Sequence, residues 1–255
     1  MNRITQILPY YNSAGMLKAQ LLNWMVLPKE ILDHLLVILI DDGSPRYPAL
    51  PVIKEVRPLK SLRLRLYRVT VDIPWNQHGA KNLGAKEAPD GWMFMSDIDH
   101  MLPYDSISGL MRTKLDPTKF YTLQRVTAVK KEDGNLKYDL MTDIHGKPKP
   151  HPNTFLLTRK LFWETGGYDE DYCGTYGGDG PFVRMLEKVS AGRVHFQDLD
   201  LVRWTRDQIP DASQEPEFRE AYKAQYRKLF DEKGRKGTRD IKPVNPIRFP
   251  WERLL

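Results

Sequence analysis

The amino-acid sequence predicts an α/β fold built on a mostly parallel sheet flanked by helices. Three observations lead to this prediction. Short apolar runs of strand length alternate with helix-patterned segments through the first hundred residues. Two of these runs, residues 35–40 and 92–95, are continuously apolar, as parallel strands buried on both faces usually are. Both runs stop abruptly at acidic residues, which indicates that a loop begins there.

The elements of the first half follow in order. Residues 4–9 form a short strand that ends at Pro9, and residues 14–25 carry apolar side chains at helical spacing. Residues 62–71 alternate basic and apolar side chains, as a half-exposed strand does, and residues 79–88 have a helical pattern. Because strands and helices alternate, we expect parallel strands joined by right-handed crossovers.

The second half has a more antiparallel character. Residues 120–130 and 136–141 flank Glu132-Asp133-Gly134-Asn135, which predicts a hairpin turn. Residues 154–158 form a further strand, and residues 181–189 return to a helical pattern. Between Phe218 and Lys242 the chain is strongly basic. We therefore expect one domain over residues 1–205, with a small antiparallel region inside it, and a basic helical C-terminal extension over residues 206–255.

Composition and charge limit the classes of function. The chain has 255 residues, 41% of them hydrophobic, which suffices for one large buried core. It has no apolar run long enough for a membrane-spanning helix, and its first residues lack the features of a signal peptide. The single cysteine, Cys173, excludes an internal disulfide and a cysteine-rich zinc site. These features favour a cytoplasmic protein.

The net charge of +6 favours anionic partners such as nucleotides, nucleic acid or acidic membrane surfaces. A solvated basic surface without a specific partner is the alternative interpretation.

Two acidic clusters predict a ligand site. Ligands of parallel sheets bind beyond the carboxyl ends of the strands, so the acids after residues 35–40 and 92–95 should face one crevice. Asp97 and Asp99 are two residues apart and offer oxygen ligands for Mg²⁺ or Mn²⁺, unless they form a solvated turn. Asp42, beside Gly43, could accept a hydrogen bond from a nucleobase or a ribose, or it could close a plain turn.

A glycine-rich segment over residues 166–180 contains the third candidate group. Its glycines would let a loop fold tightly over a ligand, and its three tyrosines offer flat surfaces for stacking. Asp179 precedes a predicted helix. It is a candidate general base, or alternatively the N-cap of that helix with Gly180 and Pro181 at its first positions.

Taken in this order, the motifs resemble those of GT-A glycosyltransferases, in particular the family 2 group, over residues 4 to about 205. The resemblance rests on five segments: Leu8-Pro9-Tyr10-Tyr11-Asn12, Asp41-Asp42-Gly43-Ser44, Gly79-Ala80-Lys81-Asn82-Leu83-Gly84, Ser96-Asp97-Ile98-Asp99, and Leu161 to Glu170. The last segment, continued to Asp179, is also similar to a galactosyltransferase C-terminal motif. That motif has two acids before its helix, and here Gly178 takes the first place.

The resemblance implies a GT-A fold and an inverting, metal-dependent transfer of sugar from a nucleotide-sugar, expected to be a UDP-sugar, to a hydroxyl acceptor. Asp179 would be the general base. Mn²⁺ or Mg²⁺ would be held by Asp97 and Asp99, with His195 as the first choice for a third ligand and His145 and His151 behind it. The donor would contact the remaining predicted positions, which are Pro9, Tyr10, Tyr11, Asp42, Lys81, Asn82 and, through ribose, Asp97.

Two alternatives stay open. The basic segment could make the chain a nucleic-acid-binding protein, or a glycosyltransferase whose acceptor is a modified base in DNA rather than a carbohydrate. The substitution at Gly178 would also fit a catalytically inactive member of the fold. The donor sugar and the acceptor are not readable from the sequence.

Overall fold

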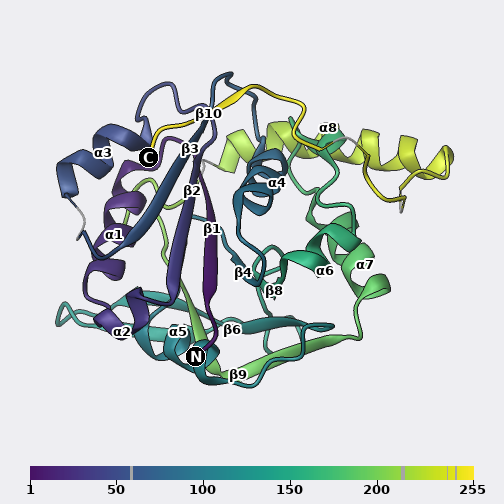
Figure 1. The fold of residues 1–255 in the computed structure, drawn as a ribbon. Helices are drawn as coiled ribbons and strands as arrows, with labels where there is room; N and C mark the ends of the chain where they lie inside the picture. The colour runs from purple at the N-terminus through teal and green to yellow at the C-terminus, as the bar shows by residue number, and fades with distance from the viewer. Residues whose placement is uncertain (58–59, 214–215, 240, 245) are drawn as a thin grey trace.

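A computed structural model of the chain describes residues 1–57, 60–213, 216–239, 241–244 and 246–255. Its centre is one mixed sheet whose strands lie in the order β10-β3-β2-β1-β4-β8-β6-β9-β5, with β7 paired to β6 (Figure 1). None of the helices in these ranges is long and apolar enough to cross a membrane.

The parallel half of the sheet consists of four strands, β1 (Ile4–Tyr10), β2 (Leu35–Asp41), β3 (Arg63–Val69) and β4 (Trp92–Met95). Strand β1 lies between β2 and β4, and both it and β2 are buried along their whole length. This double-sided burial is why β2 is continuously apolar up to Asp41, whereas β1 includes two buried polar residues, Thr5 and Gln6. The predicted strands and the predicted helix at residues 14–25, α1 (Ala14–Met25), are confirmed.

Helices cover both faces of this half, and the alternating side chains of the strands fill both interfaces. On one face, Val37 and Leu39 pack with α1, α3 (Ala49–Val56) and α5 (Tyr104–Arg112). On the other face, Ile38 and Ile40 pack with α4 (Gln77–Glu87), α6 (Arg159–Glu164) and α7 (Asp179–Val189). Figure 1 shows the two groups of helices on opposite sides of β1 and β2. A short helix, α2 (Lys29–Leu32), precedes β2.

The antiparallel half extends the sheet beyond β4. Strand β8 (Phe155–Thr158) runs antiparallel to β4 and β6 (Phe120–Lys130), and β6 pairs parallel with β9 (Arg193–Arg203). Strand β7 (Leu136–Leu140) returns from β6 through the predicted hairpin turn, which is confirmed. The two-residue β5 (His100–Met101) pairs with the end of β9 and so places the chain after Asp99 beside that strand.

The C-terminal part forms a helix and then returns to the sheet. Helix α8 (Pro216–Arg235) covers much of the predicted basic segment, but the chain continues to β10 (Trp251–Arg253), which pairs antiparallel with β3. Phe249 joins the core beside α4, and Asp211 accepts hydrogen bonds from the backbone N–H groups of Gly15 and Met16 at the start of α1. These contacts tie residues 206–255 closely to residues 1–205.

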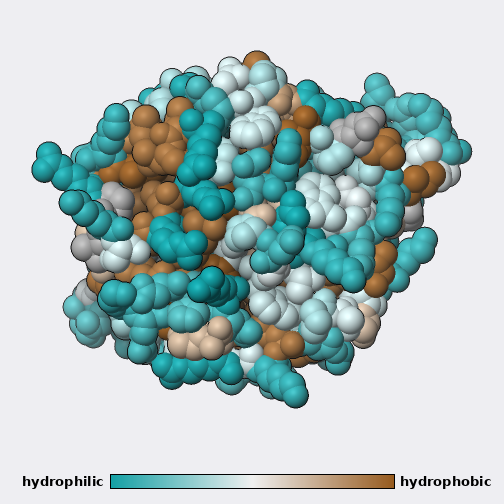
Figure 2. All heavy atoms as spheres, viewed as in Figure 1, coloured by the Kyte–Doolittle hydropathy of each residue, from teal (hydrophilic) through white to brown (hydrophobic). Residues whose placement is uncertain are grey.

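The surface seen from the same side is mostly hydrophilic (Figure 2). Hydrophobic side chains gather on the left of that view, over the region where Figure 1 shows α1 and α3.

Candidate functional site

A cavity of about 260 Å³ opens where the strands of the parallel half end. Its walls come from the loops after β1, β2 and β4, from the start of α4 and α7, and from β6, β9 and the segment leading into α8. The structure brings together these predicted site residues in its lining: Pro9, Tyr10, Tyr11, Asp42, Asp97, Asp99 and Asp179.

Neighbouring acids at the end of β2 have different surroundings. Asp41 accepts hydrogen bonds from the backbone N–H groups of Ser44 (2.9 Å) and Ala49 (2.8 Å), so it closes the turn. Asp42 lines the cavity and accepts one hydrogen bond, from Asn76 Nδ2 at 2.8 Å. Burial raises the pKa of Asp42 to about 7. A carboxyl group that is partly protonated near neutral pH can both donate and accept hydrogen bonds.

Asp42→Asn should make the stability of the protein less dependent on pH. The pKa of Asp42 is about 7 in the folded protein against an ordinary value of 3.8, so folding favours the neutral form. The wild type therefore loses stability as pH rises through this interval, by about 2 kcal/mol between pH 5 and pH 7. Asparagine cannot ionise and keeps an acceptor for Asn76, so this loss should disappear.

Chemical unfolding at both pH values measures the difference, with exposed Asp105→Asn as the control. Equal losses of stability in wild type and Asp42→Asn would show that Asp42 ionises normally in the folded protein.

The loop after β1 is held to the loop after β2. Asn12 Oδ1 accepts hydrogen bonds from the backbone N–H groups of Arg46 and Tyr47, each at 3.0 Å. Tyr10 donates its hydroxyl to the carbonyl of Tyr47, and Tyr11 donates to Asp72 Oδ1 at 3.1 Å. The aromatic rings next to Asp42 are thus fixed before any ligand binds.

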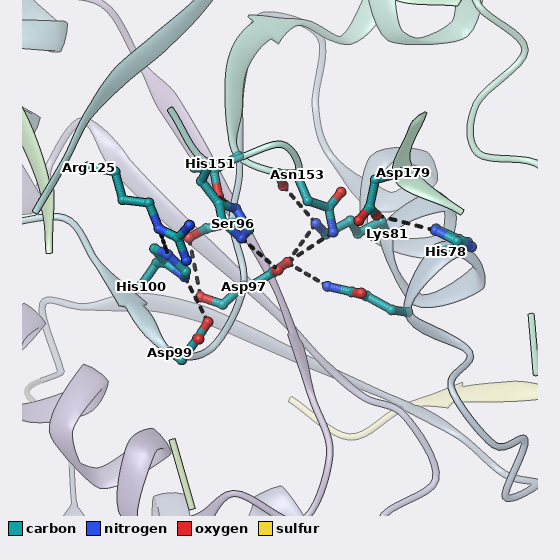
Figure 3. A network of polar contacts seen from close by, with 12 residues as sticks. His78, Lys81, Ser96, Asp97, Asp99, His100, Arg125, His151, Asn153 and Asp179 are labelled. Carbon is teal, nitrogen blue, oxygen red and sulfur yellow. Dashed lines mark hydrogen bonds and ion pairs between the residues drawn. The ribbon is translucent and has the colours of Figure 1, made fainter. Parts of the chain in front are cut away.

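Asp97 presents two different oxygens. Its Oδ1 accepts hydrogen bonds from Lys81 Nζ (2.7 Å), Gln77 Nε2 (2.5 Å) and Asn153 Nδ2 (3.3 Å) (Figure 3). Its Oδ2 faces His151 Nε2 at 3.7 Å. One oxygen is therefore saturated by the protein, whereas the other faces an imidazole nitrogen.

Asp99 is oriented by a buried histidine. Nδ1 of His100 donates to Asp99 Oδ1 at 2.7 Å, and Nε2 of His100 accepts from Arg125 Nε at 2.9 Å (Figure 3). This pattern requires a neutral His100 with its proton on Nδ1. Burial raises the pKa of Asp99, while His151, Arg125 and Arg203 act against that shift. A cation close to Asp99 would stabilise its ionised form.

Asp179 is the first residue of α7, and its N-cap is Gly178, so the alternative in which Asp179 caps the helix is wrong. The Asp179 carboxylate lies 3.4 Å from Nε2 of His78, a nearly fully buried residue of α4 whose ring stacks on Tyr168. A Cβ atom at position 178 would overlap Cε1 of His78 and lie 2.8 Å from Cβ of Tyr172. The histidine therefore occupies the space that a side chain at 178 would need.

Sequence reasoning missed His78 and ranked His151 below His195. The one available signal for His78 was its place one helical turn before Lys81, in the segment that starts α4.

Four predicted residues lie outside the cavity lining. His145 is exposed in the turn after β7, where its backbone N–H donates to Asp143. Lys81 is fully buried behind Asp97. Asn82 bonds to Tyr168 and Glu170 and so holds the glycine-rich loop instead of facing a ligand. His195 lies on β9 with its Nδ1 at 3.1 Å from Thr122 Oγ1, and the structure does not place it with Asp97 and Asp99.

The donor atoms at this end of the cavity fit a divalent ion of the Mg²⁺ or Mn²⁺ type. Asp97 and Asp99 provide carboxylate oxygens, and Nε2 of His151 lies beside them. Among the described residues, no group of three or more His, Cys, Asp or Glu side chains is placed so that it could hold a metal ion. Mg²⁺ usually takes further ligands from substrate phosphates and water.

The sequence model described as Glycosyl transferase family 2 matches residues 5–175. The chain belongs to this family. Because the match ends at residue 175, Asp179 and the galactosyltransferase-like motif lie beyond it. No curated protein matches this chain.

Solved structures of low sequence identity share its fold. GalNAc-T7, solved with UDP, GalNAc and Mn²⁺, is 14% identical with a TM-score of 0.60, covering 80% of this chain and 43% of that protein. The mannosyltransferase PcManGT from Pyrobaculum calidifontis, solved with GDP-Man and Mn²⁺, is 19% identical with a TM-score of 0.60, covering 79% and 56%. S. aureus TarS residues 1–349 are 12% identical with a TM-score of 0.58, covering 94% and 75%.

These likenesses confirm the predicted GT-A fold. The chain spans about half the length of the first two of these proteins.

Proposed function

We propose that this glycosyltransferase moves a sugar, with inversion, from a nucleoside-diphosphate sugar to a hydroxyl acceptor, with Asp179 as the general base. One observation carries the proposal: Asp42, Asp97, Asp99 and Asp179, which are up to 137 residues apart in sequence, line a single cavity beyond the strand ends. If the nucleoside of the donor lies at Asp42 and its diphosphate at Asp99, the sugar would lie within reach of Asp179.

The nucleoside would bind beside Asp42 and the fixed rings of Tyr10 and Tyr11, with Asp97 near the ribose. A UDP-sugar is our expected donor. Since one similar structure contains UDP and another GDP-Man, the tests below include both nucleotides.

Asp99 and the free Oδ2 of Asp97 would hold the divalent ion, with Nε2 of His151 beside Asp97. When bound, such an ion would neutralise the negative charge that develops on the departing diphosphate. The protein contributes the orientation of this ligand set, because His100 fixes Asp99, while Lys81 and Gln77 fix Asp97.

In the transfer step, the acceptor oxygen would form a bond to the anomeric carbon while the bond from that carbon to the diphosphate breaks. The diphosphate leaves with the bonding electron pair, and the acceptor proton moves to the Asp179 carboxylate. A carboxylate is a weak base for a free hydroxyl, so this proton moves late, when the oxygen is already bonded. His78 Nε2–H would donate to Asp179 and keep its carboxylate facing the cavity.

Thermal denaturation with nucleotides and Mn²⁺ tests the donor site. At a hundredfold excess over Kd, a bound nucleotide should add about 2.7 kcal/mol, or roughly 5–10 °C in Tm for a chain of this size. Asp99→Asn should remove the part of this shift that depends on Mn²⁺, because it deletes a carboxylate ligand.

The exposed substitution Asp105→Asn serves as the control and should leave the shift unchanged. The absence of any shift across UDP, GDP and their sugars would count against the proposed donor site.

We propose that the acceptor is a hydroxyl of a carbohydrate or of another small molecule, and not a base in DNA. Several cations of α8 are paired within the protein: Lys233 contacts Asp169 (2.8 Å) and Asp171 (2.6 Å), and Lys236 contacts Glu232 (2.6 Å). Pairing of this kind reduces the charge available to a phosphate backbone.

A further inference from the structure

Two arginines lie side by side on one wall of the cavity. Strands β6 and β9 pair so that Arg125 is opposite Leu201, two residues from Arg203. Residues two apart on a strand share a face, so Arg125 and Arg203 lie on the same face of the sheet. Both line the cavity near Asp99, and Figure 3 shows Arg125 directed toward His100 and Asp99.

Neither arginine is neutralised by the protein. Within the described ranges, no carboxylate oxygen lies within 4.0 Å of either guanidinium. The bond that Arg125 makes through Nε goes to a neutral acceptor, Nε2 of His100. Among the residues that the structure describes, Nε of Arg203 is buried without a hydrogen-bond partner.

Burying an unpaired charge raises the free energy of the folded protein, and a neighbouring charge of the same sign raises it further. Burial and the nearby Arg203 both lower the pKa of Arg125, because both destabilise its charged form. Asp99 is the nearest opposite charge, but His100 already occupies one of its oxygens. An anion bound between the two guanidinium groups would relieve this cost.

We propose that Arg125 and Arg203 form a subsite for the diphosphate of the donor, so that a nucleoside diphosphate binds even without a divalent ion. This inference rests on the proposed donor site, whose diphosphate end is at Asp99. Guanidinium groups match phosphate oxygens with two parallel N–H donors each, and two of them balance the two negative charges of a sugar-linked diphosphate. The divalent ion and the arginines would then share the charge of the leaving group.

Titration calorimetry of the whole chain in EDTA tests the subsite, with UDP and GDP as probes and uridine and guanosine as the matched ligands without phosphate. We expect a diphosphate to bind at least about tenfold more tightly than its nucleoside, with an affinity that falls as salt rises. Arg203→Met should remove most of this advantage and leave nucleoside binding unchanged. Since it also removes an unsatisfied buried donor, Arg203→Met should fold at least as well as wild type.

Two further variants sharpen the test. Arg203→Lys keeps the charge but loses the paired donors, so its affinity for UDP should fall between those of wild type and Arg203→Met. Arg193→Met, at the other end of β9 where the side chain is exposed, should bind UDP as the wild type does.

Three results would overturn the inference. They are equal affinities for UDP and uridine in EDTA, unchanged UDP affinity in Arg203→Met, and UDP binding that appears only with Mn²⁺. The last result would leave the proposed function intact, because UDP binding that depends on Mn²⁺ still requires a donor site at Asp99. If no nucleotide or nucleoside binds with or without Mn²⁺, the donor site itself is refuted, and the subsite with it.

Discussion

Asp179→Asn is expected to slow sugar transfer roughly 10²–10⁴-fold, the usual contribution of a positioned general base. Asparagine is nearly the same shape as aspartate and can stay beside His78, but it cannot accept the proton of the acceptor hydroxyl. Nucleotide binding should remain intact because Asp179, at the start of α7, is proposed to contact the acceptor hydroxyl and neither the nucleoside nor the diphosphate. The measurement is the rate of glycosylated product formed, together with the Tm shift produced by the nucleotide.

Glu187→Gln provides a matched control, because Glu187 is an exposed acid on the same helix. It should leave both the rate and the Tm shift unchanged. If Asp179→Asn transfers sugar as fast as the wild type, another group must remove the proton and the proposed role of Asp179 is refuted.

Gly178→Asp, which restores the acid expected from the galactosyltransferase-like motif, is predicted to damage this protein. The new Cβ would overlap the ring of His78 and crowd Tyr172, and overpacking of this kind costs about 1–3 kcal/mol. A second carboxylate beside Asp179 adds like-charge repulsion. We expect a lower Tm and slower transfer, because a displaced His78 no longer holds Asp179.

The matched control is Gly180→Asp, two residues further along the first turn of α7. A Cβ there meets only Arg184 Nη1 at 3.5 Å, and an acid near a helix N-terminus is favourable. In the double variant His78→Ala with Gly178→Asp, the overlap is gone, so its loss of stability should be smaller than the sum of the two single losses. Additive losses would mean that His78 and position 178 do not compete for space.

Much of the fold could be predicted because its main elements carry their own patterns. The continuous apolar runs of β2 and β4 reflect burial on both faces, and the helical spacing in α1 matches its observed bounds. The hairpin between β6 and β7 followed from its turn residues. Strands β5 and β10, of two and three residues, are too short to show any period. Their existence depends on the neighbours β9 and β3.

The candidate site was predictable where a residue follows directly from a strand end or from the glycine-rich segment. Asp42, Asp97 and Asp99 were found in the first way and Asp179 in the second. His151 reaches Asp97 from a segment 54 residues later, and His78 meets Asp179 across 101 residues. Arg125 and Arg203 become neighbours only through the register of β6 and β9.

The sequence by itself determined the parallel core, the acidic strand ends and the motifs of the family, because each of these depends on residues close together in the chain. Tertiary structure alone decided which oxygen of Asp97 is left free, why position 178 holds a glycine, and that two arginines share one wall of the cavity. Those features depend on distances between residues far apart in sequence. Such distances are set by strand pairing and helix packing, which no local pattern records.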